Sequence, residues 1–155
     1  MKLEWMGEYR ELIMEYIKAC NRYARNYRTV HYEFEGIPLS AATVQVLEYI
    51  LENEEEKLPM SRLAERLGVT RGAFSKITAQ LCKQELIEKY HPADSDKEFV
   101  LTLTEKGRKV YQDYSDAVSG QVFAPLFREM EQMPEQSRKD LLHIFRVINS
   151  EAENR

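Results

Sequence analysis

The sequence predicts a mainly α-helical chain that carries one small β-hairpin. Apolar residues recur every three or four positions along most of its 155 residues, the spacing of helices with one buried face. Between residues 61 and 81 two short helical patterns meet at a glycine, and two strand-like runs follow before residue 104. A chain of this length is expected to form one domain that buries its own core without disulfides.

A pair of short helices over residues 61–81 is the most informative part of the chain. The first, 61–67, ends at Gly68, a residue that readily adopts the left-handed conformation of a helix end. Thr70 can cap the second helix because its hydroxyl can accept an unpaired backbone N–H of the first turn. The second helix then has a single apolar stripe formed by Phe74, Ile77 and Leu81. Together these features predict a helix-turn-helix.

The other side of the second helix is small, hydroxylic and cationic. Small residues let a helix approach a DNA groove closely, and Arg or Lys pair with phosphates or with guanine edges. Hydroxyl groups can reach phosphates or base edges as well. For each residue an ordinary solvent-exposed position is the alternative. The residues expected to read DNA from this helix are Thr70, Arg71, Gly72, Ala73, Ser75 and Lys76.

Two strand-like runs, 86–91 and 98–103, follow the helix pair. The polar, turn-forming segment 92–97 separates them, so they predict an antiparallel hairpin, the wing of a winged helix-turn-helix. Residues 58–60 are expected to add a short strand to this sheet. Lys89 in the first strand and Lys97 at the tip are expected to contact the DNA backbone or minor groove.

This stretch resembles the winged helix-turn-helix of the multiple-antibiotic-resistance regulator (MarR) family. The sequence Leu-Ala-Glu-Arg-Leu-Gly-Val at 63–69 is similar to the support helix and turn, and 70–81 to the recognition helix. Residues 86–89 are similar to the first wing strand. The sequence Leu-Thr-Glu-Lys-Gly at 103–107 is similar to the exit into the next helix.

Two residues depart from the family pattern. Glu85 stands just before the first wing strand, where the family usually has glycine. At the wing tip Asp94 and Asp96 precede Lys97, where the family usually has arginine. Lysine keeps the charge but lacks the flat guanidinium that fits a narrow minor groove, so weaker reading by the wing is expected.

The resemblance implies a homodimer with helices from both chain ends at the interface. It also implies a double-stranded operator that is an imperfect palindrome, and repression released by a small aromatic or amphipathic ligand. The whole chain is then a single MarR-like domain in three parts. These parts are an N-terminal dimerisation helix and connection (1–38), a winged helix-turn-helix (39–110) and C-terminal dimerisation helices (111–155).

The charge distribution agrees with a DNA-binding centre. The chain carries a net charge of −4, yet residues 61–110 hold ten Lys or Arg against seven Asp or Glu. The first sixty residues sum to −4 and the last forty-five to −3. Positive charge is therefore concentrated where phosphates would be met, and binding should depend on salt.

The flanking segments read as helices with apolar faces. Residues 3–30 are expected to form one long helix, followed by a connection over 30–38 and a helix that Ser40 caps and that runs to Asn53. After the wing, Thr104 is expected to cap a long helix. Pro125 lacks an N–H, so a kink or break is expected near 121–124, and Pro134 should open the last helix.

Two kinds of signal are possible. A Tyr-rich group can line a ligand cleft, although the same rings can instead pack at the dimer interface. Cys20, on the apolar stripe of the first helix, raises the alternative of a peroxide sensor; an inert small hydrophobic residue is the simpler interpretation. The Tyr-rich group consists of Tyr16, Tyr23, Tyr27 and His31, with Tyr32 adjoining it.

Other classes of function find little support in the sequence. There is no Gly-rich phosphate loop, HExxH or GxSxG motif, so no enzyme or cofactor is expected. Cys20 and Cys82 lack metal-ligand spacing, and no metal site is expected. A winged-helix module that binds protein instead of DNA remains a third possibility. Without an apolar run of membrane-spanning length or a signal peptide, the chain is expected in the cytoplasm.

Overall fold

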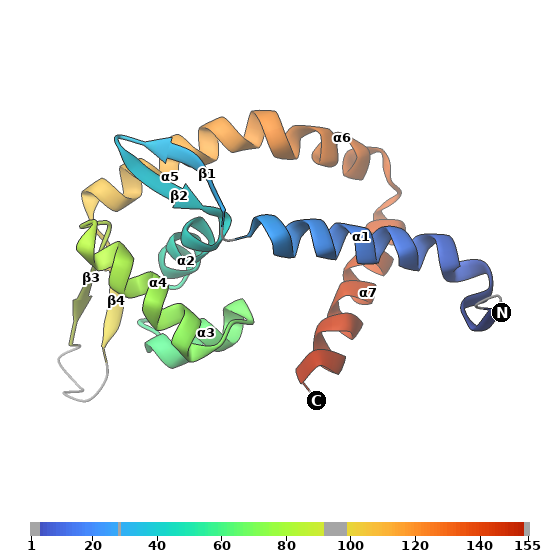
Figure 1. Ribbon diagram of the computed structural model, residues 1–155, viewed down its shortest axis with the longest axis horizontal. Coiled ribbons are helices and arrows are strands. Elements are labelled where there is room, and N and C mark those ends of the chain that lie inside the picture. The colour runs from blue at the N-terminus through green and yellow to red at the C-terminus, as the bar shows by residue number, and fades with distance from the viewer. Residues whose placement is uncertain (1–3, 28, 92–98, 154–155) are drawn as a thin grey trace. The chain divides into compact units, whose positions relative to one another are not determined.

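The computed structural model of the protein describes residues 4–27, 29–91 and 99–153. Within these ranges the chain is mostly helical and has two antiparallel pairs of strands (Figure 1). It divides into two compact units, residues 1–114 and 115–155. The mainly α-helical fold with a small hairpin, predicted from the sequence, is confirmed.

The N-terminal helix is shorter than predicted. A 3-10 helix, η1 (Glu4–Tyr9), precedes α1 (Arg10–Asn26), and Gly7 between them has φ 50° and ψ −137°. That conformation is far from helical and available mainly to glycine, so the expected single helix over 3–30 is wrong at both ends. None of the side chains of α1 is buried.

A second hairpin stands where the sequence predicted only a connection. Strands β1 (Val30–Phe34) and β2 (Ile37–Ser40) pair antiparallel around Glu35 and Gly36, whose φ angles are 51° and 76°. Two positive φ values in succession form the tight turn that suits a hairpin. The ring of Tyr32 lies edge-on against that of Tyr114, with centroids 5.2 Å apart, so the hairpin packs on the first unit's last helix.

The core of the first unit is built around α2 (Ala41–Glu52). Ser40 caps this helix as predicted, since its hydroxyl accepts from the Thr43 N–H at 3.2 Å. Half of the α2 residues are buried, against β2, α3, α4 and β4. The buried residues are Ala42, Thr43, Val44, Val46, Leu47 and Ile50.

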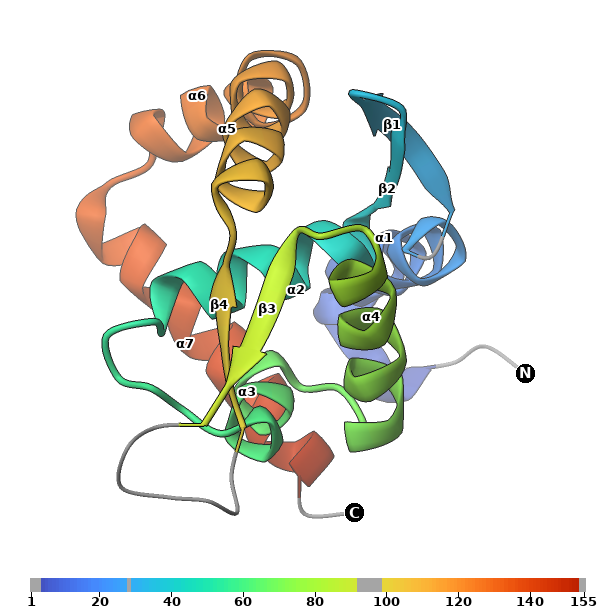
Figure 2. The same cartoon turned by 90° about the vertical axis from the view of Figure 1, so that its left-hand side faces the viewer.

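The predicted helix-turn-helix and wing are present (Figure 2). Helices α3 (Met60–Leu67) and α4 (Arg71–Lys83) precede strands β3 (Ile87–Tyr90) and β4 (Val100–Leu103), which pair antiparallel. Pro59 bridges Val100, so the expected third strand is reduced to a single isolated pairing. The tip of the wing, with Lys97, lies outside the described residues.

The sequence predicts a kink or break before Pro125, and the structure has a π-helical turn there, within a run that stays helical over residues 105–132. Helix α5 (Glu105–Val118) begins after Thr104, whose hydroxyl accepts from the Gly107 N–H at 3.0 Å. It gives way to a π-helical turn, η2 (Ser119–Phe123), directly before α6 (Ala124–Gln132), which has Pro125 in its first turn. The last helix, α7 (Glu135–Glu153), starts after Pro134.

Apolar side chains remain uncovered on helices of both units. In α1, Leu12 is 66% exposed, and in η1, Trp5 is 76% exposed. In α6 and α7, Phe127 and Phe145 are each exposed by nearly half. The core lies in the first unit, and the terminal helices keep apolar surface that the single chain does not bury.

Gly107 provides a test of this fold. A Cβ at this position would lie 1.9 Å from the Leu86 carbonyl oxygen, so Gly107→Ala must push the start of α5 away from the start of the wing. We expect a loss of at least roughly 2 kcal/mol in the free energy of unfolding, measured with urea and circular dichroism. Gly72→Ala is the matched control, because a Cβ there meets no atom within 4 Å. Equal stability of the two variants would contradict the packing described.

Candidate nucleic-acid interface

Local hydrogen bonds fix the turn between α3 and α4. Gly68 ends α3 in the left-handed conformation, with φ 73° and ψ 28°. Its N–H donates to the Glu65 carbonyl at 3.0 Å, and the Val69 N–H donates to the Ala64 carbonyl at 3.1 Å. Thr70 then caps α4, since its hydroxyl accepts from the Ala73 N–H at 3.2 Å. The predicted roles of Gly68 and Thr70 in the turn are confirmed.

One side of α4 is buried against the core. Phe74 and Leu81 are buried, and Ile77 is partly buried beside them, as the predicted apolar stripe requires. Thr78 is also fully buried, and its hydroxyl donates to the Ser75 carbonyl at 3.1 Å. This bond satisfies a polar group inside the core, so the helix is held with its opposite side outward.

The opposite side of α4 is free of apolar bulk and carries cations. We call this surface the reader face. It consists of Arg71, Gly72, Ser75, Lys76, Ala79 and Lys83, all exposed. Thr70 at the helix start is exposed beside it, and Ala73 is partly buried. Five of the eight predicted DNA contacts therefore lie on α4 and a sixth, Thr70, caps it. Lys89 is exposed on β3, and Lys97 lies outside the described residues.

Ion pairs separate the cations around the reader face into two groups. Five of the described cations between residues 61 and 110 are paired with carboxylates. The other four have no carboxylate partner within the part of the chain that the structure describes: Arg71, Lys76, Lys83 and Lys89. The paired cations are Arg62, Arg66, Lys106, Arg108 and Lys109, which meet Glu65, Glu56, Glu85, Glu54 and Glu35.

Lys83 is a candidate that the sequence analysis missed. It is exposed at the end of α4 and lies seven residues, about two helical turns, after Lys76. That spacing puts both cations on one side of the helix, and it could have been recognised from the sequence. The reader face thus extends over the whole length of α4.

A hydrogen-bonded cluster fixes α3 against α2. The Asn53 side chain is buried at the end of α2, donates to the Tyr49 carbonyl at 2.7 Å and accepts from the Arg66 guanidinium. The Tyr49 hydroxyl donates to the Arg66 carbonyl at 3.2 Å. Arg66 also pairs with Glu56 at 2.9 Å. These bonds hold the last turn of α3, and with it the turn that leads into α4.

Glu54 fastens the base of the wing. Its carboxylate accepts from the Thr102 hydroxyl and the Leu103 N–H, each at 2.8 Å, and from Arg108 at 2.5 Å. Burial disfavours the ionised carboxylate, but the bonds from Arg108, Leu103 and Thr102 outweigh it and hold the pKa of Glu54 below its ordinary value. One side chain from the loop after α2 therefore joins β4 to α5.

The residues proposed for ligand binding are only partly brought together. The rings of Tyr23 and Tyr27 lie 5.3 Å apart, whereas Tyr16 lies one helical turn before Cys20, which raises the pKa of the Tyr16 hydroxyl. His31 lies on β1. A hollow of about 450 Å³ runs along α1, lined by Glu15, Lys18, Ala19, Arg22, Tyr23 and Asn26. Of the four predicted residues, Tyr23 is the one that lines it.

A second hollow, of about 190 Å³, lies between the start of α2 and the middle of α4. It is smaller than most pockets for organic ligands, which hold roughly 300–1,000 Å³. Among the described residues, no group of three or more His, Cys, Asp or Glu is placed to hold a metal ion. In the same ranges no helix is long and apolar enough to cross a membrane.

Comparisons with known proteins agree with this geometry. Residues 36–97 match the sequence model of the MarR family. The chain is similar to the HTH-type transcriptional regulator PchR of Bacillus subtilis (strain 168), with 22% identity over 117 residues, which are 76% of this chain and 68% of PchR. It is also similar to the crystal structure of a MarR/EmrR family transcriptional regulator from Acinetobacter sp. ADP1. That match has a TM-score of 0.69 and 15% identity, over 94% of this chain and 97% of the other.

A further match is to Lactococcus lactis ZitR in complex with DNA, with a TM-score of 0.61 and 17% identity, over 94% of this chain and 98% of ZitR. The fold and the reader face define a DNA-binding protein of the winged helix-turn-helix class. Residues 36–97, which span the helix-turn-helix and the first wing strand, match the MarR family, whose members are transcription regulators. The family resemblance found in the sequence is confirmed.

Substitution of Glu54 tests the base of the wing. Because the pKa of Glu54 is lowered by folding, its stabilisation is present above the ordinary carboxyl pKa and disappears as the pH falls through the lowered value. Glu54→Gln should cost about 1–2 kcal/mol of unfolding free energy at neutral pH, and the difference from the wild type should shrink in acid.

Urea unfolding measured from neutral to acidic pH gives both quantities. Glu55→Gln is the control, because this exposed neighbour makes no ion pair within the described residues. If the cost of Glu54→Gln were equal at all pH values, the carboxylate would not be the group that fastens the wing.

Proposed function

We propose that the protein is a homodimeric transcriptional repressor that binds an imperfect DNA palindrome in the cytoplasm and is released by a small ligand. The observation that carries the DNA-binding part is the reader face, on which three exposed cations have no carboxylate partner in the described part of the chain. A face of this kind can enter a major groove because small residues separate its cations.

Within this proposal the residues have distinct roles. Arg71, at the first position of α4, is suited to a guanine edge or a phosphate, because the start of a recognition helix points into the groove. Lys76 and Lys83 contact phosphates, and Ser75 and Thr70 donate to phosphates or base edges. Lys89 and Lys97 supply the wing's contacts to the DNA backbone.

Substitution of Arg71 tests the DNA-reading role. Arg71→Ala removes an exposed cation from the reader face and should weaken operator binding by roughly 1–3 kcal/mol if Arg71 reads a base. Preference should also relax at one operator position. Titrations of operator variants by fluorescence anisotropy measure both effects.

The matched control is Lys139→Ala, which changes the net charge equally on α7. Each variant is first checked for folding by its circular dichroism spectrum. Operator affinity and preference equal to those of the wild type in a folded Arg71→Ala protein would refute this assignment of the reader face.

The homodimer is supported by the uncovered apolar side chains of the terminal helices. Ile13 and Ile17 in α1, and Ile144 and Phe145 in α7, are 38–48% exposed in the single chain. Surfaces of this kind in helices at both ends of a chain suit burial against a second copy. A two-fold dimer would place its recognition helices about one DNA turn apart, roughly 34 Å, on the two halves of a palindrome.

The dimer is tested by placing a charge on these surfaces. Ile13→Glu and Phe145→Glu should each shift the protein toward monomer and weaken operator binding, because a lone subunit reads one half-site. Sedimentation velocity measures the assembly. Lys139→Glu is the control on α7, since this side chain is exposed and polar. A wild-type protein that is monomeric at micromolar concentration would contradict the homodimer.

We further propose that the effector binds near Tyr23, with Tyr16, Tyr27 and His31 as the other candidates. Burial raises the pKa of Tyr23, and a hydrogen bond with Gln45 partly offsets this effect. Gln45 belongs to α2, the helix on which α3 and α4 pack. A ligand at Tyr23 would therefore act on the element that supports the reader face.

Peroxide sensing through Cys20 is the alternative mode of release. Cys20 is exposed, and a hydrogen bond with Cys20 raises the pKa of the nearby Tyr16. Exposure is necessary for a sensing thiol but also occurs for many inert ones. A protein-binding winged helix is the third possibility, and it is less well supported because the reader face is cationic and has no large apolar side chain.

A further inference from the structure

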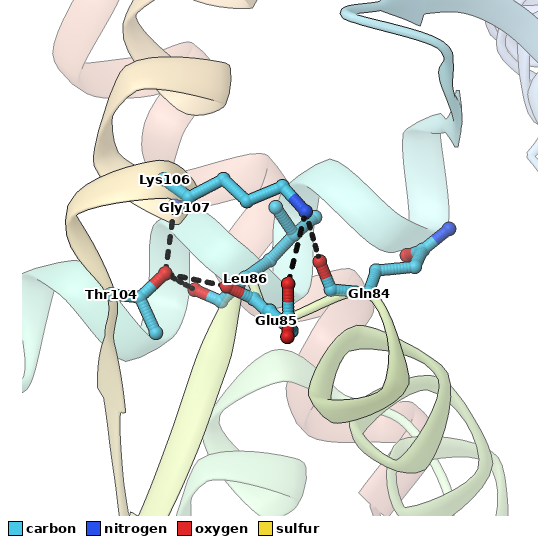
Figure 3. Close-up of polar contacts among 6 residues, drawn as sticks. All are labelled: Gln84, Glu85, Leu86, Thr104, Lys106 and Gly107. Carbon is cyan, nitrogen blue, oxygen red and sulfur yellow. Dashed lines mark hydrogen bonds and ion pairs between the residues drawn. The ribbon is translucent and has the colours of Figure 1, made fainter.

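The recognition helix ends at a junction of four elements (Figure 3). Gln84 follows the last residue of α4, and Glu85 has a φ of 60° before β3 begins. A positive φ is uncommon for a residue other than glycine, so the turn before β3 holds Glu85 in a conformation that glycine adopts more readily. β4 returns to the same place and leads through Thr104 into α5.

Hydrogen bonds at Thr104 join the residues before β3 to the start of α5. The Thr104 N–H donates to the Leu86 carbonyl at 3.0 Å. The Thr104 hydroxyl lies 2.7 Å from the Glu85 carbonyl, to which it can donate, and accepts from the Gly107 N–H. Gly107 packs so closely on the Leu86 carbonyl that no side chain fits between them. The start of α5 is thus fixed to the start of the wing.

Lys106 extends this connection to the recognition helix itself. Its ammonium group donates to the Gln84 carbonyl at 2.8 Å and lies 3.6 Å from a carboxylate oxygen of Glu85. The carbonyls at the end of a helix lack partners within the helix and carry partial negative charge, so a cation there is favourable. Here the cation comes from α5 and not from α4 itself.

We propose that Lys106 is a positioning residue for DNA binding, which fixes the orientation of α4 relative to α5. The proposal rests on the homodimeric repressor described above. Helix α5 begins at this junction and runs past residue 114 into the second unit. With Lys106 in place, α4 and α5 keep one relative orientation, so a displacement of α5 is passed to the reader face.

This role differs from a direct contact between Lys106 and DNA. A phosphate contact adds affinity evenly and steepens the salt dependence of binding by about one unit. A positioning contact instead sets the direction of the recognition helix, and through it the separation of half-sites that the dimer accepts. The two roles therefore predict different responses to operator spacing and to salt.

The test uses the full-length protein with Lys106→Met, and with Lys109→Met as the matched control. Lys109 lies three residues further along α5, is also exposed, and pairs with Glu35 of the β1–β2 hairpin instead of with the recognition helix. Both variants lose one positive charge and one ion pair. Binding is measured with palindromic operators whose half-sites are moved apart or together by one and two base pairs, at several salt concentrations.

For Lys106→Met we expect roughly three- to tenfold weaker binding to the preferred operator, a flatter dependence on half-site spacing and an unchanged salt slope. Lys106→Arg should restore the spacing preference, because a guanidinium can also donate to the Gln84 carbonyl. Lys109→Met should keep the wild-type profile. Thermal unfolding of every variant shows whether a loss of binding follows from a loss of fold.

Three results would overturn the proposal. A salt slope lowered by about one with the spacing preference intact would make Lys106 a phosphate contact. A profile equal to that of the wild type, or equal losses in both Met variants, would remove the special role of Lys106. Failure of the wild type to prefer any spacing would refute the dimeric reader itself, which separates that failure from a failure of the junction.

Discussion

The burial of α2 is the constraint on which the DNA-reading part of the molecule depends. Leu47 and Ile50 lie at the centre of the core, and α3, α4 and β4 all pack on this helix. Ser40 fixes its start, and Asn53 at its end holds α3 through Arg66. Because α4 packs on the same core through its apolar stripe, its cationic side is left outward. The orientation of the reader face thus follows from the packing of apolar side chains.

Some cations of the first unit pair with carboxylates and stabilise the fold, whereas those of α4 are available for DNA recognition. Glu54 and Glu56 come from the acidic loop after α2 and hold cations of α5 and α3. These pairs stabilise the wing and the support helix, so their cations already have carboxylate partners. The cations of α4 meet no such carboxylate in the described part of the chain, and they remain available to phosphates. An acidic protein can therefore present a basic surface on α4, because Glu54 and Glu56 pair with cations of other helices.

Much of this arrangement could be predicted from residues that act locally. Gly68 and Thr70 determine the turn between α3 and α4 through their own backbone and hydroxyl groups, so the sequence was sufficient there. Pro125 acts in the same way on the helix after the wing. The β1–β2 hairpin was missed because Glu35 takes a positive φ, which no local rule assigns to glutamate. Its strands gain support from Tyr114, far along the chain.

The sequence by itself determined the order of the helices and the position of the recognition helix, since periodicity and caps depend on neighbouring residues, and its motifs indicated the resemblance to the MarR family. Only the tertiary structure decided which cations are committed to ion pairs, because Arg108 and Glu54 are distant in sequence. It also decided the contact between Lys106 and Gln84. Such contacts exist only once β3 and β4 have paired and brought the end of α4 to the start of α5.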